Sequence, residues 1–334
     1  MNPAIYREVQ REYDLKRQKA INEAESRKQR LLETEPKFNE LVLKKNKIAL
    51  ELAKAVVTSK GIDKQIAKEN LEIKLNEAEK EIKNYMLQLK LDENYLSPKF
   101  ECNRCEDTGF INGEIRCNCF TQRIVNITYK QDNMLKLKDE NFNTFDIAYF
   151  SNKKDKEKYN SDKSPLENIE DIKKVSQVFC ENIKNEKQKN LLFVGKAGTG
   201  KTFMSSCIAN EAVNKGYTVL YQTAPLLMDM IVDAKFSSAK DEFKKEQYAK
   251  VFDVDLLIID DLGTENINNV KFTELFNIIN TRLLKDKKTI ISTNLTLPDL
   301  AQEYDDRVMS RLIGNYTICR FFGDDIRLKK KKMN

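Results

Sequence analysis

The sequence predicts an α/β domain built on a parallel sheet, preceded by an all-helical region and a small four-cysteine module. Three observations lead to this prediction. Residues 3–92 are almost free of Gly and Pro and carry helical periodicity, four cysteines follow between residues 102 and 119, and from residue 166 onward apolar strands alternate with helices. Alternating strands and helices are typical of a parallel sheet with helices on its faces.

Shifts in composition suggest where the segments end. A polar, aperiodic stretch that ends at Pro165 separates the helical part of the chain from the α/β part. We therefore expect a helical domain over 1–95, a cysteine module with a connecting helix over 96–135, a linker over 136–165, and an α/β domain over 166–334.

The composition indicates a cytoplasmic protein with no membrane partner. Of 334 residues 33% are charged, and the formal net charge is +6. No window approaches the ~18 consecutive apolar residues that a membrane span needs, and the first residues lack the apolar core of an export signal. The mild positive charge permits nucleic-acid binding without requiring it. Seven cysteines, an odd number, suit a reducing compartment where disulfides are rare.

The helical region divides into three blocks. The first runs to about Leu32, where "ETEP" interrupts it, the second runs from Phe38 to Ser59, and the third runs from Asp63 to Leu91. This order predicts a small bundle or an antiparallel coiled-coil hairpin. Its highly charged surface is open to two interpretations, a solvated face or a face that binds a partner.

The cysteine module "CNRCEDTGFINGEIRCNC" predicts a structural metal site. Cys102, Cys105, Cys117 and Cys119 have the C-x2-C and C-x-C spacing of a short hairpin that can place four thiolates around Zn²⁺. The chain contains no histidine, so a tetrahedral site here is all-thiolate and has no open position for catalysis. A pair of disulfides, an iron–sulfur cluster and four free thiols are the alternatives.

The strand "NLLFVG" leads into "GKAGTGKT" and then into a helix, which is the context of a phosphate-binding loop. Three of the ten glycines lie here, where backbone N–H groups must approach phosphate oxygens. We expect Lys201 to reach the β- and γ-phosphates of a nucleoside triphosphate and Thr202 to place its hydroxyl on Mg²⁺. The nucleotide-binding residues are Gly195, Lys196, Ala197, Gly198, Thr199, Gly200, Lys201 and Thr202.

Two further strands are predicted to end in polar residues beside this loop. In "DLLIIDDLG" a strand over Leu256–Ile259 is followed by Asp260, the expected Mg²⁺ ligand, and Asp261, the candidate for polarising the attacking water. A simple acidic cap on the strand is the alternative for one of the two. "KTIISTN" ends at Asn294, whose amide could orient water or the γ-phosphate.

These motifs, together with "DRVMSRLIGN" and "FFGDDIR", resemble those of the AAA+ ATPases that load the bacterial replicative helicase, the DnaI/DnaC type. The resemblance covers roughly residues 140–329. Four cysteines between a helical region and the ATPase motifs make the chain most similar to the DnaI branch. Over residues 1–95 the similarity is only one of architecture.

The resemblance implies that the nucleotide is ATP and that the α/β domain self-associates. It places Asn294 at the first sensor, Arg307 and Arg311 in the arginine-finger segment, and Arg327 at the second sensor. It also implies that the helical arm grips the replicative helicase, a DnaB-type hexamer. Many AAA+ proteins have Glu where this chain has Asp261, which implies a slow, switch-like ATPase. From the residues alone, the two arginines could instead pair with nearby carboxylates at Glu303, Asp305 or Asp306.

An insertion between the first two motif strands extends this interpretation. Helical segments over Pro225–Ala234 and Ala239–Lys250 exceed one crossover, and the resemblance implies a path for single-stranded DNA along them. Lys235, Phe236, Lys240, Lys244 and Lys245 would supply charge and one aromatic face. A solvated helical face is the alternative, and the same choice applies to the C-terminal lysine run after Arg327.

The sequence therefore favours an ATP-hydrolysing helicase loader over two alternatives. A transposition-helper ATPase of the IstB type shares the AAA+ motifs, but such helpers generally lack the cysteine cluster. A non-catalytic, nucleotide-locked adaptor has no need for two finger candidates and a second sensor.

Overall fold

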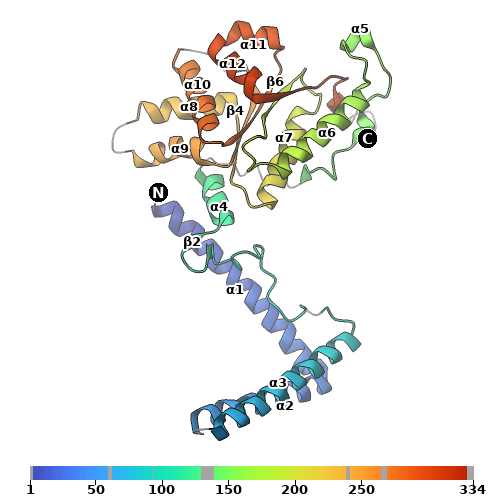
Figure 1. Ribbon diagram of the computed structural model, residues 1–334, viewed down its shortest axis with the longest axis vertical. Coiled ribbons are helices and arrows are strands. Elements are labelled where there is room, and N and C mark those ends of the chain that lie inside the picture. The colour runs from blue at the N-terminus through green and yellow to red at the C-terminus, as the bar shows by residue number, and fades with distance from the viewer. Residues whose placement is uncertain are drawn as a thin grey trace. The chain divides into compact units, whose positions relative to one another are not determined.

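A computed structural model describes residues 3–58, 62–92, 94–128, 139–237, 241–264 and 269–328 (Figure 1). The chain folds into two compact units, one of residues 11–113 and one of residues 1–10 together with 114–334. No helix among the described residues is long and apolar enough to cross a membrane.

The unit over 11–113 is built from helices, as predicted. Helix α1 spans Pro3–Thr34, α2 spans Pro36–Thr58 and α3 spans Ile62–Gln88. Proline at the first position of α2 separates it from α1, because proline fits the first turn of a helix but not its interior. Leu31, Phe38 and Met86 form the small core where these helices meet. A core of this size leaves most of the helical surface charged and exposed.

The α/β unit contains the predicted parallel sheet. Its five strands have the order β4-β5-β6-β3-β7, and every pair is parallel. The strands are β3 (Asn190–Val194), β4 (Val219–Thr223), β5 (Leu256–Leu262), β6 (Lys288–Thr293) and β7 (Tyr316–Arg320). All side chains of β3 and β6 are buried, which explains why their sequences are continuous apolar runs without alternation.

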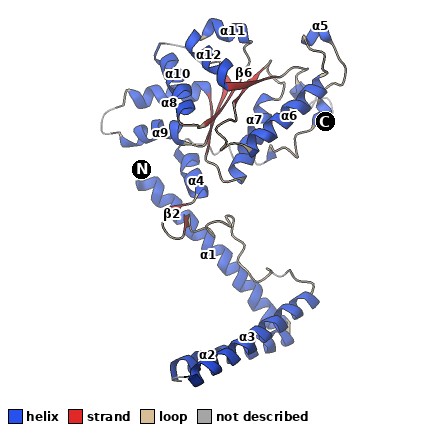
Figure 2. Ribbon diagram, viewed as in Figure 1, coloured by secondary structure: helices blue, strands red, loops and turns tan. Residues whose placement is uncertain are grey.

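Helices cover both faces of this sheet (Figures 1 and 2). Leu191 and Phe193 of β3 pack on one face and Leu192 and Val194 on the other, because successive side chains of a strand alternate. The first face carries α6 (Pro165–Glu181) and α7 (Lys201–Asn214), and the second carries α8 (Ala224–Lys235), α9 (Glu242–Asp253), α10 (Asn269–Leu284) and α12 (Asp306–Asn315). Shorter elements are η2 (Ile147–Tyr149), α5 (Lys156–Tyr159) and α11 (Leu297–Glu303).

Strand β4 is an edge strand, and helix α4 (Asn118–Thr128) covers that edge. The side-chain amide of Gln122 donates to the carbonyl of Val219 at 2.9 Å and accepts from the backbone N–H of Val219 at 2.6 Å. This exchange imitates the pairing that a further strand would make, so the edge is satisfied by a side chain. Asn118 at the start of α4 donates to the carbonyl of Gly216 just before β4.

A fully buried arginine connects helix α9 to strand β6 in this unit. Arg282 of α10 has no exposed surface, and its guanidinium donates to the carbonyls of Val251, Val254 and Lys288 and to the Thr289 hydroxyl. The four distances lie between 2.6 and 3.1 Å. Arg282 therefore ties the end of α9 to the start of β6.

We predict that Arg282→Met destabilises the protein by about 3–5 kcal/mol, because several buried carbonyls lose their donor at about 1–3 kcal/mol each. Urea denaturation followed by circular dichroism measures the change. Lys285→Met is the matched control, since Lys285 pairs with Asp253 on the surface with 49% of its side chain exposed. Equal stability of the two variants would contradict the role given to Arg282.

Candidate nucleotide-binding site

The phosphate-binding loop connects β3 to α7. Gly200 is the residue before α7 and has φ of 99°, a left-handed conformation that favours glycine. The loop carbonyls of Gly195 and Lys196 point toward Lys201, the first residue of the helix. The N-terminal end of α7 is therefore directed at the space enclosed by the loop, where an anion would be stabilised.

Lys201 lies at the centre of the site and is only 4% exposed. Its Nζ donates to the carbonyls of Gly195 at 2.6 Å and Lys196 at 3.0 Å, and to Asn294 Oδ1 at 2.8 Å. Burial lowers the pKa of Lys201, while Asp261 and Asp260 act to raise it. The structure thus brings together Lys201 and Asn294, which are 93 residues apart in the chain.

Asp260 is 3% exposed and is held by both of its carboxylate oxygens. The hydroxyl of Tyr221 donates to Oδ2 at 2.7 Å, and the hydroxyl of Ser292 donates to Oδ1. Tyr221 lies on β4 and Ser292 on β6, the two strands that flank β5. Our sequence analysis missed both residues. The only available signal was that Ser292 lies in the predicted strand "KTIISTN"; no strand was predicted at Tyr221.

Asp261 is placed by an irregularity in β5. The strand extends to Leu262, three residues beyond the predicted end at Ile259, and its pairing with β6 shifts register between these two residues. Asp261 has φ of 56°, which Asp and Asn tolerate better than most residues. In a regular strand Asp260 and Asp261 would face opposite sides of the sheet.

The Asp261 carboxylate contacts the same hydrogen-bond network as Lys201. Asn294 Nδ2 donates to Asp261 Oδ1 at 3.2 Å, so Asn294 bridges the lysine and the carboxylate. Burial and the neighbouring Asp260 charge raise the pKa of Asp261, and Lys201 opposes that shift. A raised pKa makes a carboxylate a better proton acceptor at neutral pH. Asp261 has the chemistry required to polarise a water molecule.

These side chains line a cavity of about 410 Å³. One wall comes from the stretch predicted to be a linker, in which Phe145, Tyr149 and Phe150 lie close to the loop. The rings of Phe145 and Phe150 stack with centroids 5.9 Å apart. An aromatic wall next to a cationic loop suits a ligand with a flat ring and phosphates. These aromatic residues were missed because the stretch shows no periodicity.

The oxygen donors of the cavity fit Mg²⁺. Thr202 and Asp261 line it and Asp260 lies beside Asp261, so hydroxyl and carboxylate oxygens, the ligands that Mg²⁺ prefers, gather at the end of β5 and the start of α7. Magnesium would supply charge neutralisation for the phosphates.

Arg327 lines the same cavity, whereas Arg307 and Arg311 do not. The two arginines of α12 lie by the ring of Phe276 on α10, at 5.2 and 6.0 Å from its centroid. Arg307 also pairs with Asp305 at 2.7 Å, as the surface alternative expected. Arg311 donates to Asn280 at 3.2 Å.

In the segment expected to line a DNA path, Lys235 and Lys244 have carboxylate partners. Lys235 pairs with the buried Glu274, and Lys244 pairs with Asp233 at 2.9 Å. Phe236, at the end of α8, is 70% exposed. The aromatic contact thus remains available, while these pairs reduce the net positive charge. Lys240 and the lysine run over 329–332 lie outside the described residues.

The four predicted zinc ligands lie together. The Sγ atoms of Cys102, Cys105, Cys117 and Cys119 all lie within 4.8 Å of one another. The loop that carries the first pair is held by Asp107, whose buried carboxylate accepts the backbone N–H groups of Glu101 and Cys102 at 2.8 and 2.9 Å. Asp107 was also missed by the sequence analysis. Four converging sulfurs suit a soft, tetrahedral metal ion.

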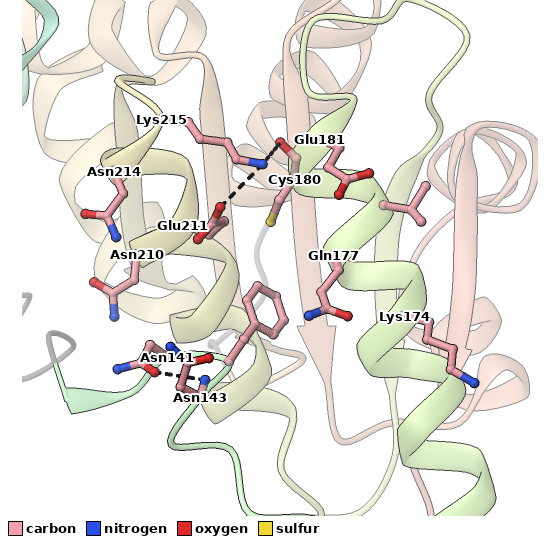
Figure 3. Close-up of a pocket in the computed structure, with 12 residues that line it drawn as sticks. Asn141, Asn143, Lys174, Gln177, Cys180, Glu181, Asn210, Glu211, Asn214 and Lys215 are labelled. Carbon is pink, nitrogen blue, oxygen red and sulfur yellow. Dashed lines mark hydrogen bonds and ion pairs between the residues drawn. The ribbon is translucent and has the colours of Figure 1, made fainter.

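A larger hollow of about 760 Å³ lies between α6 and α7 (Figure 3). Polar side chains dominate it, and Lys215, the residue after α7, reaches toward Glu211 at 3.3 Å and the carbonyl of Cys180 at 3.5 Å. None of the loop residues or the aspartates lines it. Because the converging charges lie in the smaller cavity, we assign the site there.

A phosphate-binding loop between a buried parallel strand and a helix defines the class of P-loop nucleotide-binding α/β proteins. Residues 121–334 match the family described as IstB-like ATP binding protein. The chain belongs to this family, the IstB/DnaC type of AAA+ ATPases.

Two of the relatives are an insertion-sequence protein and a helicase loader. The chain is 26% identical over 153 residues to the insertion sequence IS21 putative ATP-binding protein of Pseudomonas aeruginosa, covering 44% of this chain and 56% of the relative. It is 28% identical over 139 residues to the replicative helicase loader DnaC of Escherichia coli K12, covering 41% of this chain and 56% of the relative. A crystal structure of the DnaC helicase loader matches with 25% identity and a TM-score of 0.41, covering 46% of this chain and 89% of that chain.

The first site prediction concerns Asp261→Asn. We expect ATP hydrolysis to fall by about 10²-fold or more, because the amide cannot accept a proton from water. The fold favours the protonated form of Asp261, whose pKa is raised, so its contribution to stability is lost as pH rises through that pKa. The variant should therefore be slightly more stable than wild type at pH 7, by less than ~1 kcal/mol, and the difference should vanish only below about pH 3, where Asp261 is protonated in both the folded and the unfolded state.

Asp255→Asn is the matched control for this prediction. Hydrogen bonds from Thr218 and Lys287 outweigh burial and lower the pKa of Asp255, so the same substitution should destabilise the protein at pH 7. Urea denaturation at pH 7 and at the low pH measures the change in free energy of unfolding of each variant relative to wild type. A less stable Asp261→Asn protein at pH 7 would show that the Asp261 carboxylate is not strained by its neighbour.

Proposed function

We propose that this protein is an ATP-dependent loader of the replicative DNA helicase onto single-stranded DNA. The observation that carries the proposal is the cavity in which Lys201, Asn294 and Asp261 form one hydrogen-bonded chain beside Asp260. The similarity to the replicative helicase loader DnaC supports the replicative helicase as the partner of this site.

In the proposed reaction, ATP and water give ADP and phosphate. Lys201 and the loop amides bind the β- and γ-phosphates, and Thr202 and Asp260 would hold Mg²⁺, which would neutralise phosphate charge. Asp261 accepts a hydrogen bond from the attacking water while Asn294 fixes the direction of the carboxylate. Because Asp reaches less far than Glu, hydrolysis is slow and works as a switch.

Arg307 and Arg311 act on the ATP of a neighbouring subunit in this proposal. They lie four residues apart on α12, hence on one helix face, and neither lines the cavity of its own chain. Self-association of the α/β unit would bring this face to the neighbour's γ-phosphate, where an arginine stabilises the charge of the transition state.

The helical unit over 11–113 is the proposed contact with the helicase. On α2 the side chains of Leu43 and Leu50 are 62% and 56% exposed and lie seven residues apart, so they share one helix face. On α3, Ile73 is 56% exposed. Exposed apolar side chains repeated along a helix suit docking to the apolar face of a partner.

An IstB-type transposition-helper ATPase is the second candidate. The family match and the relative from an insertion sequence favour it. The two candidates differ in the partner, which is the replicative helicase for a loader and a transposase for a helper. A nucleotide-locked adaptor without hydrolysis is the third candidate. An ATPase assay in the presence of single-stranded DNA distinguishes it from the two ATP-hydrolysing candidates.

We predict that the full-length protein co-purifies with the replicative helicase of the same cell without added ATP. The double variant Leu43→Ser, Leu50→Ser should weaken this binding at least tenfold, because each buried leucine contributes about 1.5–3 kcal/mol. Leu15→Ser, at a residue of α1 that is 63% exposed, is the matched control and should bind normally.

Lys201→Ala should retain helicase binding and lose ATP-dependent loading, because the lysine contacts the nucleotide and not the partner. A protein that captures a transposase and ignores the helicase would support the IstB-type function instead. Binding of the helicase that is unaffected by the leucine substitutions would move the contact to another surface.

The four-cysteine cluster is proposed to hold one structural zinc ion, as in the DnaI branch. The sulfurs supply four ligands and leave no open coordination position. Because thiolate coordination stabilises the folded state, loss of the ion should unfold the module first.

We predict about one zinc per chain by elemental analysis of protein purified without added metal. Cys105→Ser should lose the metal, whereas Cys180→Ser, at a buried cysteine outside the cluster, should keep it. Iron with acid-labile sulfide in place of zinc would indicate an iron–sulfur cluster. Four thiols that react freely in the native protein, with no metal, would rule out a metal site.

A further inference from the structure

The C-terminal segment over 321–327 runs along the phosphate-binding loop. A Cβ atom added at Gly195 would lie 2.2 Å from the carbonyl oxygen of Phe321, and one added at Gly198 would lie 2.1 Å from Cγ of Asp325. At Gly195 the obstruction is backbone and leaves no space for a side chain, whereas at Gly198 the Asp325 side chain would have to move and φ of 76° itself favours glycine. The glycines of this loop therefore make room for the C-terminal segment as well as for phosphates.

The carboxylate of Asp325 is fixed on the loop. The next residue, Ile326, donates its backbone N–H to the carbonyl of Gly198 at 2.9 Å, which anchors the segment. Asp325 Oδ1 also accepts the backbone N–H of Arg327 at 2.9 Å. The hydrogen bonds of the Ile326 and Arg327 backbone N–H groups thus restrict where the Asp325 side chain can lie.

Arg327 is held by this carboxylate through two parallel hydrogen bonds. Its Nε donates to Oδ1 at 3.1 Å and its terminal nitrogen donates to Oδ2 at 2.9 Å. The Arg327 side chain is 69% exposed, and Asp325 is its only ion-pair partner among the described residues. A long, exposed side chain would otherwise sample many rotamers at a cost in entropy on binding.

The charge of Arg327 is directed at the nucleotide cavity. Arg327 and Lys201 both line it, and the positive charge of Arg327 lowers the pKa of Lys201 in addition to the larger effect of burial. Two cations that face one cavity repel each other until an anion binds. Asp325 offsets that repulsion and keeps Arg327 near the cavity in the absence of a phosphate.

We propose that Asp325 is a positioning residue that pre-orders Arg327 for the γ-phosphate and so sets the preference of the site for ATP over ADP. The inference rests on the proposed function, because it requires that the cavity binds ATP. Asp325 does not touch the nucleotide in this proposal. It acts through Arg327, whose guanidinium is supplied by the segment that lies on the loop.

The test compares Asp325→Asn with wild type by calorimetric titration of the full chain with ADP and with a non-hydrolysable ATP analogue, both with Mg²⁺. Asparagine keeps an acceptor for the Arg327 backbone N–H and removes the charge that holds the guanidinium. We expect affinity for the analogue to fall about two- to fivefold, the range of an exposed ion pair, and affinity for ADP to stay the same. In an Arg327→Ala background the same substitution should have no effect on either affinity.

Asp324→Asn is the matched control, because the neighbouring carboxylate pairs with Lys158 at 3.0 Å and does not line the cavity. An unchanged or higher ATP-to-ADP preference in Asp325→Asn would overturn the inference, and so would an equal loss in the Arg327→Ala background. If wild type binds neither nucleotide, the proposed function itself fails. If nucleotides bind and only Arg327→Ala changes the ATP-to-ADP preference, the proposed function is supported and the positioning role of Asp325 is contradicted.

Discussion

The order of the strands in the sheet is the constraint on which the site depends. Strand β6 lies between β3 and β5, so the carboxyl ends of the three strands meet at one edge. Asn294 at the end of β6 can then contact Lys201, which follows β3, and Asp261 on β5. An order that placed more strands between β3 and β5 would move the lysine away from the aspartate by about 4.8 Å for each added strand, beyond the reach of the Asn294 bridge.

Asp260 and Asp261, which are adjacent at the end of β5, have different surroundings. Asp260 is buried and receives hydrogen bonds from Tyr221 and Ser292, which fix its orientation. Asp261 has a left-handed backbone and a raised pKa beside the charge of Asp260. A strained backbone and adjacent like charges cost stability, and such costs are concentrated at functional sites. Buried, hydrogen-bonded groups such as Arg282 on α10 stabilise the same unit.

The two units suit different tasks for a physical reason. The α/β unit buries continuous apolar strands between helices, and a rigid core of this kind can hold catalytic groups in place. The helical unit buries few large side chains and leaves Leu43, Leu50 and Ile73 exposed, which suits a surface completed by a partner. Four cysteines with converging sulfurs offer a local way to stabilise a region whose apolar core is small.

Local sequence patterns predicted the three N-terminal helices, the strands β3, β5 and β6, the phosphate-binding loop and the convergence of the four cysteines, because each depends on residues near one another in the chain. The sequence also identified Lys201 from the glycine-rich loop motif, and Asp260, Asp261 and Asn294 because they follow apolar runs.

The tertiary structure decided what those patterns do not encode, which is the set of contacts between distant segments. The bulge that turns Asp261, the hydroxyls of Tyr221 and Ser292 on Asp260, and the contact of Asp325 with Gly198 all depend on register between separate elements. The aromatic wall of Phe145, Tyr149 and Phe150 also depends on contacts between distant segments. A hydrogen bond between residues dozens of positions apart leaves no periodicity in the sequence, so only the folded chain reveals it.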